Sequence, residues 1–247
     1  MKIILIKYGG RAIKKSLTRS KILKGISCLQ QTDSVIIVHG GGPQITRTLN
    51  RLGIKTKFVQ GMRYTDKKTL DVVESILCNK VNKDIVKKLR KFYPEVVGIS
   101  CKEGNIVTAR RIKKLGFVGE VKTVNTKYIR YLMAKKIIPV IAPVAYDNKK
   151  RTLNINADNV AVALACALKA DNLIFMTDVP GVLDKDKKVI PSIKINRIKE
   201  LIKDKVVTEG MIPKLNSCYK AIKKGVKKVI ITNAENGLLK SYGTTIG

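Results

Sequence analysis

The chain is poor in the residue types that hold metals or stack on nucleic-acid bases. Its 247 residues include one histidine, His39, and five cysteines, and aromatic residues make up 5%. The cysteines are odd in number, widely spaced and outside any paired metal-ligand motif, whereas a zinc site needs several such ligands. We therefore expect no metal site in the protein and five reduced, mostly buried thiols, at Cys28, Cys78, Cys101, Cys166 and Cys218.

The sequence also lacks a long apolar run. The N-terminal segment "MKIILIKYGG" carries lysines and glycines around an apolar stretch that is too short for a signal peptide. No run approaches the ~18 apolar residues that a membrane-spanning helix needs. We expect a cytoplasmic protein that has no membrane partner.

Acidic residues are scarce: Lys and Arg number 50 and Asp and Glu 18, which gives a formal net charge of +32. Such a balance alone is typical of nucleic-acid-binding proteins. The lysines, however, are spread along every segment, and no motif for reading a groove or stacking on a base is present. We interpret the excess as a solvated surface, typical of an AT-rich genome, and expect no specific nucleic-acid partner.

Short apolar runs alternate with segments of helical periodicity. The runs are β-branched and nearly uninterrupted, which predicts buried strands at residues 2–8, 34–40, 95–100, 137–144, 172–179 and 227–233. Helical spacing of apolar residues is found at 65–92, 156–170 and 211–225. Strands and helices in alternation form parallel pairs with right-handed crossovers. The sequence therefore predicts the α/β class, with a three-layer αβα sandwich around a mainly parallel sheet in one domain, residues 1–247.

One segment departs from this alternation. Residues 102–124 combine an alternating apolar pattern with glycines, which is typical of hairpins. We predict that this segment forms a lid or rim over the site.

Glycine turns follow the first two predicted strands, at Lys7–Gly10 and at His39–Gly42. Each turn precedes a helical segment, so backbone N–H groups and a helix N-terminus would face the carboxyl ends of the strands, where anions bind. Neither turn matches the GxxxxGK[ST] or the GxGxxG motif. The two turns indicate an anion site without identifying the anion.

Two lysines are placed where a lysine is locally unfavourable. Lys7 closes an apolar strand, where its ammonium must reach water or meet an anion. Lys214 follows Gly210 and Pro213, which mark a helix start, and a cation in a first helical turn opposes the macrodipole. Together the two lysines indicate a ligand that carries phosphate.

Polar residues cluster before two further elements. Asn154, Asn156 and Asp158 precede an alanine-rich helix, and one N-cap accounts for only one of the three. Asp178 ends a predicted strand before a Pro-Gly turn, a position that suits binding of a nucleoside.

Taken in order, these motifs resemble the amino acid kinase family, and within it the enzymes that phosphorylate N-acetyl-L-glutamate. The resemblance covers nearly the whole chain. It rests on "KYGG" (7–10), "VHGGG" (38–42), "GMRYT" (61–65), "GFVGEV" (116–121), "IPVIAP" (138–143), "LNINADNVA" (153–161), "TDVPGVL" (177–183), "GMIPKL" (210–215) and "GTTI" (243–246).

The resemblance implies a carbamate kinase-like fold. Residues 1–155 would mainly bind substrate and form a dimer, and residues 156–247 would mainly bind ATP. The reaction would be phosphorylation of the γ-carboxylate of N-acetyl-L-glutamate in arginine biosynthesis, with Mg²⁺ held mainly by the nucleotide phosphates. The attacking carboxylate is already ionised at pH 7, so no general base is needed, and the transfer depends on positioning and charge neutralisation.

The resemblance also implies roles for single residues. Lys7 and Lys214 would stabilise the transferring phosphoryl group, and Asp158 would hold both lysines in place. The acylated amino acid would be bound by Gly41, Gly42, Arg63 and Asn154, with Arg63 clamping the α-carboxylate and Asn154 pairing with the amide. The ATP side would be lined by Gly9, Gly10, Asp178, Val179, Pro180, Gly181, Val182, Leu183, Val206, Val207 and Thr208.

The sequence departs from the family at Cys101 and Glu103, where glycine and aspartate are usual, so we expect an altered turn there. Members of the family that arginine inhibits carry a helix ahead of the first strand. This sequence begins at its first predicted strand, so we expect a homodimer that arginine does not inhibit. We expect His39 to be a packing or turn residue.

Three alternatives stay open. The acceptor could be N-succinylglutamate, or an aminoadipate or glutamate carried on a small acidic protein, which a charge of +32 would suit. The alternative from another class is a basic nucleic-acid-binding protein on a kinase-like fold.

Overall fold

The computed structural model describes residues 1–9, 16–59, 61–207, 210–234, 238 and 243–247. The chain forms two compact units: a first unit of residues 1–35 and 161–247, and a second unit of residues 36–160. The borders fall within strand β2 (Ser34–His39) and within helix α6 (Ala157–Leu168). The N-terminal segment thus folds together with the C-terminal part of the chain.

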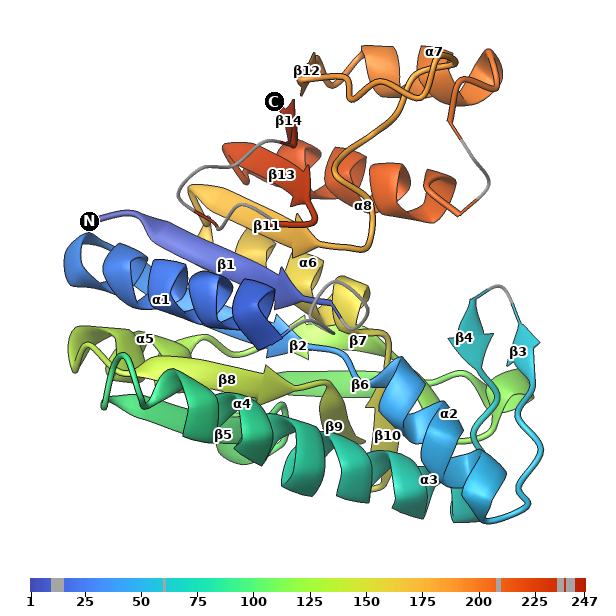
Figure 1. Ribbon diagram of the computed structural model, residues 1–247. Coiled ribbons are helices and arrows are strands. Elements are labelled where there is room, and N and C mark those ends of the chain that lie inside the picture. The colour runs from blue at the N-terminus through green and yellow to red at the C-terminus, as the bar shows by residue number, and fades with distance from the viewer. Residues whose placement is uncertain (10–15, 60, 208–209, 235–237, 239–242) are drawn as a thin grey trace. The chain divides into compact units, whose positions relative to one another are not determined.

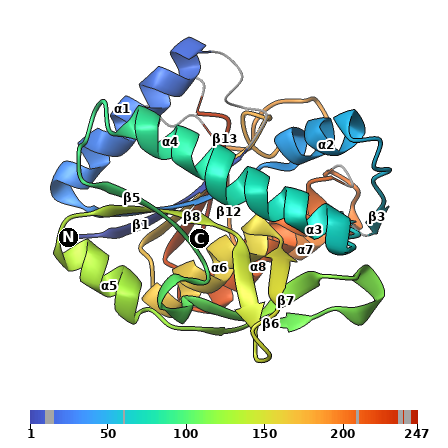
Figure 2. The same ribbon diagram turned by 90° about the horizontal axis from the view of Figure 1, so that it is seen from below.

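The first unit is a sheet with helices on both faces. Its strands have the order β12-β14-β13-β11-β1, and every pair except β13 with β14 is parallel. Helix α1 lies on one face, and α6 and α8 lie on the other (Figures 1 and 2). The bounds are β1 (Ile3–Tyr8), α1 (Ser16–Thr32), β11 (Asn172–Met176), β12 (Ser192–Ile193), α7 (Arg197–Lys203), α8 (Ile212–Lys223), β13 (Lys228–Thr232) and β14 (Thr244–Ile246).

The second unit contains the parallel strands β2-β8-β5. Helix α4 covers one face of these strands, and α5 covers the other (Figure 2). The bounds are α2 (Gly42–Arg51), β3 (Phe58–Val59), β4 (Met62–Arg63), α3 (Lys67–Glu74), the π-helical η1 (Ser75–Val81), α4 (Asn82–Leu89), β5 (Val96–Ser100), η2 (Glu103–Asn105), β6 (Val107–Arg111), η3 (Lys113–Leu115), β7 (Val118–Val124), α5 (Lys127–Ala134), β8 (Ile138–Ala142), β9 (Val144–Asp147) and β10 (Thr152–Ile155).

The predicted fold class is confirmed, because each unit has mainly parallel strands with helices on both faces. All six predicted strands form, with bounds shifted by a few residues. The strand predicted at 137–144 divides at Pro143 into β8 and β9, since proline lacks the N–H that a strand ladder uses. The helix predicted at 65–92 is the run α3-η1-α4, in which the π-helical turn was not predicted.

The predicted hairpin is also present, as the antiparallel pair β6 and β7. With β9 and β10 these two strands close into a small barrel, which we call the barrel. At Gly116 the backbone has φ +75°, and a Cβ there would overlap the carbonyl oxygen of Thr65, so glycine is required. That the hairpin acts as a lid or rim stays a prediction.

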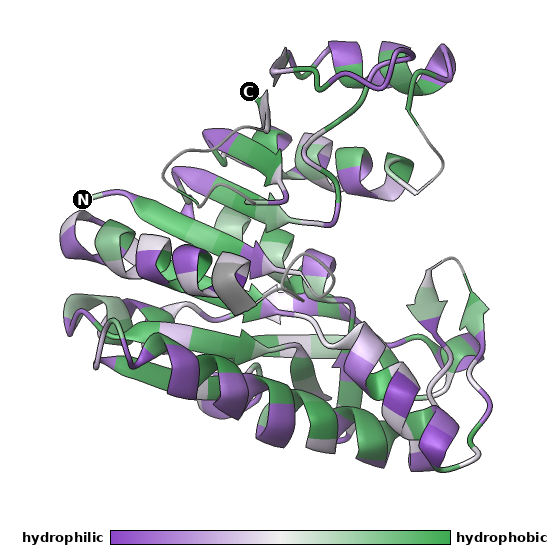
Figure 3. Cartoon of the chain, in the orientation of Figure 1, coloured by the Kyte–Doolittle hydropathy of each residue, from purple (hydrophilic) through white to green (hydrophobic). Residues whose placement is uncertain are grey.

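Apolar side chains fill the interior of both units. The strands are mostly hydrophobic, while exposed helices such as α1 and α4 alternate hydrophobic and hydrophilic residues along their length (Figure 3). In the part of the chain that the structure describes, no helix is long and apolar enough to cross a membrane.

All five cysteines are free thiols. The expectation that most are buried is only partly met. Cys101 and Cys218 are buried, Cys78 and Cys166 are half-buried, and Cys28 is exposed.

Candidate functional site

The turn after β2 places a helix N-terminus in the second unit. Gly41 is the N-cap of α2, and Pro43 occupies the first turn, where its missing N–H costs nothing. A Cβ at Gly41 would lie 2.6 Å from Cδ2 of Leu77, whereas Gly42 has open space around it. A Cβ at position 41 would therefore force the Leu77 side chain to shift, and the open space at 42 leaves the helix N-terminus accessible to an anion.

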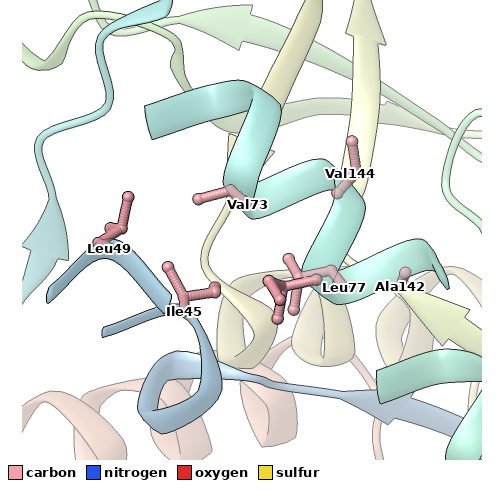
Figure 4. Close-up of a cluster of buried hydrophobic side chains, with 7 residues drawn as sticks. Ile45, Leu49, Val73, Leu77, Ala142 and Val144 are labelled. Carbon is pink, nitrogen blue, oxygen red and sulfur yellow. The ribbon is translucent and has the colours of Figure 1, made fainter. Parts of the chain in front are cut away.

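This helix is fixed by an apolar cluster. Ile45 and Leu49 of α2 pack with Val73 and Leu77 of the α3-η1 run, together with Ala142 and Val144 (Figure 4). Single π-helical turns within α-helices are frequent at functional sites. Here the π-helical turn carries the Leu77 side chain that packs below the glycine turn.

His39 is structural, as expected. Its ring is fully buried; Nδ1 lies 2.9 Å from the Gly40 carbonyl oxygen, and Nε2 lies 3.1 Å from Nδ2 of Asn82. The carbonyl needs a donor and the amide nitrogen is one, so the ring is neutral with its proton on Nδ1. Burial lowers the pKa of His39 from 6.5 to about 4, against the opposing effect of the Gly40 carbonyl. The buried, neutral ring therefore connects Gly40 at the end of β2 with Asn82 at the start of α4.

Arg63 is the buried cation of this unit. It ends β4 and is 7% exposed; Nη2 donates to Oγ1 of Thr46 at 2.8 Å, and the guanidinium lies 4.6 Å from the centre of the Phe58 ring. Among the described residues, nothing accepts a hydrogen bond from the buried Nη1. Burial also lowers the pKa of the guanidinium, which stays charged. A buried cation with an unused donor suits a carboxylate ligand.

Asn154 is connected to Arg63 through a threonine. Nδ2 of Asn154 donates to Oγ1 of Thr65 at 3.2 Å, and that hydroxyl donates to the Arg63 carbonyl oxygen at 2.8 Å. Asn154 itself lies on β10, paired with Val144 of β9. The structure thus brings Arg63, Asn154 and the N-terminus of α2 into one cluster, which we call the acceptor cluster. Sequence reasoning missed Thr65 and Thr46, although Thr65 stands in the "GMRYT" motif.

Asp158 lies in the first turn of α6, where a carboxylate is favoured by the helix dipole. The side chain of Asn156 caps this helix: its Oδ1 accepts from the backbone N–H of Asp158 at 2.8 Å and of Asn159 at 3.3 Å. The N-cap predicted among the three polar residues is therefore Asn156, which leaves Asp158 for another role.

In the first unit, Lys7 and Lys214 lie beside the same residue. Lys7 of β1 is in register with Phe175 of β11, and Nζ of Lys214 lies 5.0 Å from the centre of the Phe175 ring. A Cβ at Gly9 would overlap the carbonyl oxygen of Met176 and would lie 3.4 Å from Nζ of Lys7. Both lysines and the glycine turn thus gather at the carboxyl ends of β1 and β11, in what we call the lysine cluster.

The loop after β11 is held by a threonine from the "GTTI" motif. Oγ1 of the buried Thr244 accepts from the N–H of Val182 and donates to the carbonyl oxygen of Ile190, both at 2.7 Å. A Cβ at Gly181 would lie 2.7 Å from the same oxygen. These contacts hold Gly181 and Val182, in the second half of the 178–183 segment, against Thr244.

Two more predicted residues, Val206 and Val207, lie after α7 in the first unit. The backbone N–H of Val206 donates a hydrogen bond to the Leu201 carbonyl oxygen at 3.0 Å, and the Val207 side chain is buried. Gly10 and Thr208 lie outside the described residues.

The turn that contains Cys101 and Glu103 is stabilised by the Glu103 side chain. Oε2 of Glu103 accepts from the N–H of Ser100 at 2.9 Å and from its hydroxyl at 2.6 Å, and Cys101 is fully buried. The longer glutamate thus serves as a cap for the end of β5. Within the described residues there is no group of His, Cys, Asp or Glu that could hold a metal ion.

The fold and these clusters define a class: α/β proteins that bind anionic ligands at glycine turns and at the carboxyl ends of parallel strands. The chain belongs to the amino acid kinase family, whose model matches residues 2–233. It is therefore a phosphotransferase that uses ATP.

Individual relatives agree with this assignment. The chain is 42% identical over 244 residues to the acetylglutamate kinase of Endomicrobium trichonymphae, covering 99% of this chain and 98% of that protein. The crystal structure of smu.665 from Streptococcus mutans UA159 is 34% identical, with a TM-score of 0.86 and coverage of 99% and 98%. Carbamate kinase from Giardia lamblia, at 17% identity and a TM-score of 0.72 with coverage of 99% and 98%, shares the fold, which confirms the carbamate kinase-like architecture.

Proposed function

We propose that this protein phosphorylates the γ-carboxylate of N-acetyl-L-glutamate with ATP, giving N-acetyl-L-glutamyl 5-phosphate and ADP in arginine biosynthesis. The observation that carries the proposal is the buried Arg63, whose Nη1 has no acceptor among the described residues and whose strand is tied to Asn154. The name of the 42% identical Endomicrobium trichonymphae protein supports the same acceptor.

The acceptor cluster suits an acylated amino acid. Arg63 pairs with the α-carboxylate, since a guanidinium offers two parallel donors to the two carboxylate oxygens. Asn154 hydrogen-bonds the amide of the acyl group. Gly41 and Gly42 present the N-terminus of α2, whose positive end attracts the γ-carboxylate.

The main obstacle to the transfer is repulsion between this carboxylate and the ATP polyphosphate. The carboxylate is ionised at pH 7, so the protein needs no general base, and neutralising the developing charge does most of the catalysis. Lys7 and Lys214 supply positive charge from the lysine cluster, and the family resemblance gives Asp158 the role of positioning their ammonium groups. Mg²⁺, held mainly by the nucleotide phosphates, would neutralise further charge when bound.

The nucleotide is assigned to residues of the first unit. Gly9 and Gly10 would face the phosphates. Residues 178–183, of which Gly181 and Val182 contact Thr244, would line the nucleoside together with residues 206–208. Residues 1–155 would then mainly serve the acceptor and the dimer, and residues 156–247 mainly ATP, with Lys7 to Gly10 contributing to the nucleotide side from the N-terminal strand.

A substrate screen tests the proposal. The purified chain is incubated with ATP and Mg²⁺, and ADP release is measured with N-acetylglutamate, N-succinylglutamate, free aminoadipate and a carrier-linked glutamate. We expect turnover to be highest with N-acetylglutamate. Faster turnover with the succinylated or the carrier-linked compound would replace the proposed acceptor, and no turnover with any of them would refute the reaction.

We further propose a homodimer that works in the cytoplasm with no membrane or nucleic-acid partner. The family resemblance supports the dimer. Light scattering coupled to size-exclusion chromatography measures it directly: a mass near twice 27.4 kDa is expected, and a mass near 27.4 kDa would contradict it.

A further inference from the structure

A cavity of about 510 Å³ lies on the barrel in the second unit. Its walls come from β6, from the start of η3, from β7 and from the turn that joins β9 to β10. None of the residues assigned to the acceptor or the nucleotide lines it. The volume falls in the range of small-ligand pockets.

The lining of this cavity is strongly basic. Six of its nine lining residues are lysine or arginine, against 50 in 247 for the whole chain, so the general excess of lysine does not explain the concentration here. The one carboxylate, Asp147, has a side chain that is 6% exposed and is used within the turn. It accepts from the N–H groups of Lys149 and Arg151 at 2.9 Å and pairs with the Arg151 guanidinium at 2.7 Å.

The cations fall into two groups. The arginines have acceptors within the protein: Nε of Arg111 donates to the Gly116 carbonyl oxygen at 2.6 Å, and the exposed Arg110 pairs with Glu120 at 2.7 Å. The lysines are exposed, and no described residue forms an ion pair with Lys113, Lys122 or Lys149. Like charges around one cavity repel one another, and an anion in the cavity removes that cost.

We propose that this cavity binds a small polyanion with two or more phosphate groups. A fixed guanidinium such as that of Arg111 offers paired donors to phosphate oxygens, and the three lysines add mobile point charges around it. The six cations surround one open cavity, so a compact polyanion bound there can contact several of them at once. This site is independent of the proposed reaction.

Calorimetric titration of the full chain with inorganic tripolyphosphate tests the proposal. Saturating AMP-PNP fills the nucleotide site, and Mg²⁺ is left out because tripolyphosphate chelates it. The test variant is Lys113→Gln/Lys122→Gln/Lys149→Gln, and the control Lys91→Gln/Lys127→Gln/Lys135→Gln removes the same charge from exposed lysines of the same unit that do not line the cavity. Unfolding midpoints confirm that both variants fold, and Lys149→Glu alone serves as a milder second variant.

We expect one tripolyphosphate per chain, an affinity lowered about tenfold or more in the cavity variant, and a change of about twofold or less in the control. Lys149→Glu should also weaken binding more than the control does. Absence of binding, equal weakening in the cavity and control variants, or an unchanged cavity variant would overturn the proposal. So would a cavity variant that loses binding of a short DNA duplex while it keeps that of tripolyphosphate.

Discussion

At the scale of single residues, Arg63 and His39 are both buried in the second unit, but only Arg63 has a hydrogen-bond donor left for a ligand. Arg63 is a buried cation that keeps its charge and has an unused donor, so its environment is complete only with an anion. His39 is a buried base that stays neutral, and its two ring nitrogens are both satisfied by the protein. The first is therefore assigned to ligand binding and the second to stability.

Arg63→Lys should raise the KM for N-acetylglutamate about tenfold or more while the KM for ATP stays unchanged. Lysine keeps the charge but loses the paired donors and the contact with Phe58, so the acceptor alone is affected. Steady-state kinetics with each substrate varied measures the two constants. Arg47→Lys, on the exposed side of α2, is the matched control and should leave both constants unchanged; equal shifts in both KM values of Arg63→Lys would contradict the assignment.

The free energy of unfolding should decrease as the pH falls from about 6.5 toward 4. The pKa of His39 is about 4 in the folded protein, below its ordinary 6.5, so protons bind preferentially to the unfolded chain in this window. The loss amounts to at most about 3 kcal/mol. Urea unfolding at pH 7, 6 and 5 measures it. His39→Gln should flatten this dependence, and an unchanged slope in that variant would show that another group is responsible.

Lys7→Ala and Lys214→Ala should each lower turnover on the order of 10²-fold, the usual effect of removing a donor that stabilises a transition state. Substrate binding should change less than turnover. Lys220→Ala, an exposed lysine on the last turn of the same helix as Lys214, is the control for charge alone. Full turnover in both lysine variants would remove these residues from the mechanism.

At the scale of elements, the glycine turn at His39–Gly42 and the π-helical turn η1 pack directly against each other. Leu77 projects from the π-helical turn to a point 2.6 Å from where a Cβ of Gly41 would be, so the start of α2 sits directly on that side chain. Six strands and the helices within 65–92, 156–170 and 211–225 were predicted from periodicity, because their burial pattern is local. The π-helical turn was not, since apolar residues over 75–81 match an ordinary helix equally well.

Gly41→Ala should lower the free energy of unfolding by about 1–3 kcal/mol, because the new methyl group overlaps the Leu77 side chain. It should also raise the KM for the acceptor, since the N-terminus of α2 must shift. Gly40→Ala is the control, as nothing lies within 4 Å of a Cβ at that position. Urea unfolding compares the two, and equal stabilities would refute the close packing.

At the scale of the whole molecule, the order of residues along the chain does not show which segments fold together. Residues 1–35 fold with residues 161–247, so the lysine cluster joins positions from both ends of the sequence. The resemblance assigned Arg63 and Asn154 to the same acylated amino acid, but it did not predict the contact that links them. The hydrogen bond that ties Asn154 to Thr65 spans 89 positions, and neither periodicity nor spacing reports a contact of that range. The closure of β6, β7, β9 and β10 into the barrel is non-local for the same reason.

The central claim is that the chain makes an acyl phosphate from N-acetyl-L-glutamate. The most direct measurement traps this product with hydroxylamine, which converts an acyl phosphate to a coloured hydroxamate. With purified protein, ATP, Mg²⁺ and N-acetylglutamate, the account predicts hydroxamate in step with ADP release, and none when the acceptor or ATP is omitted. ADP release without hydroxamate, or no reaction with this acceptor, would contradict it.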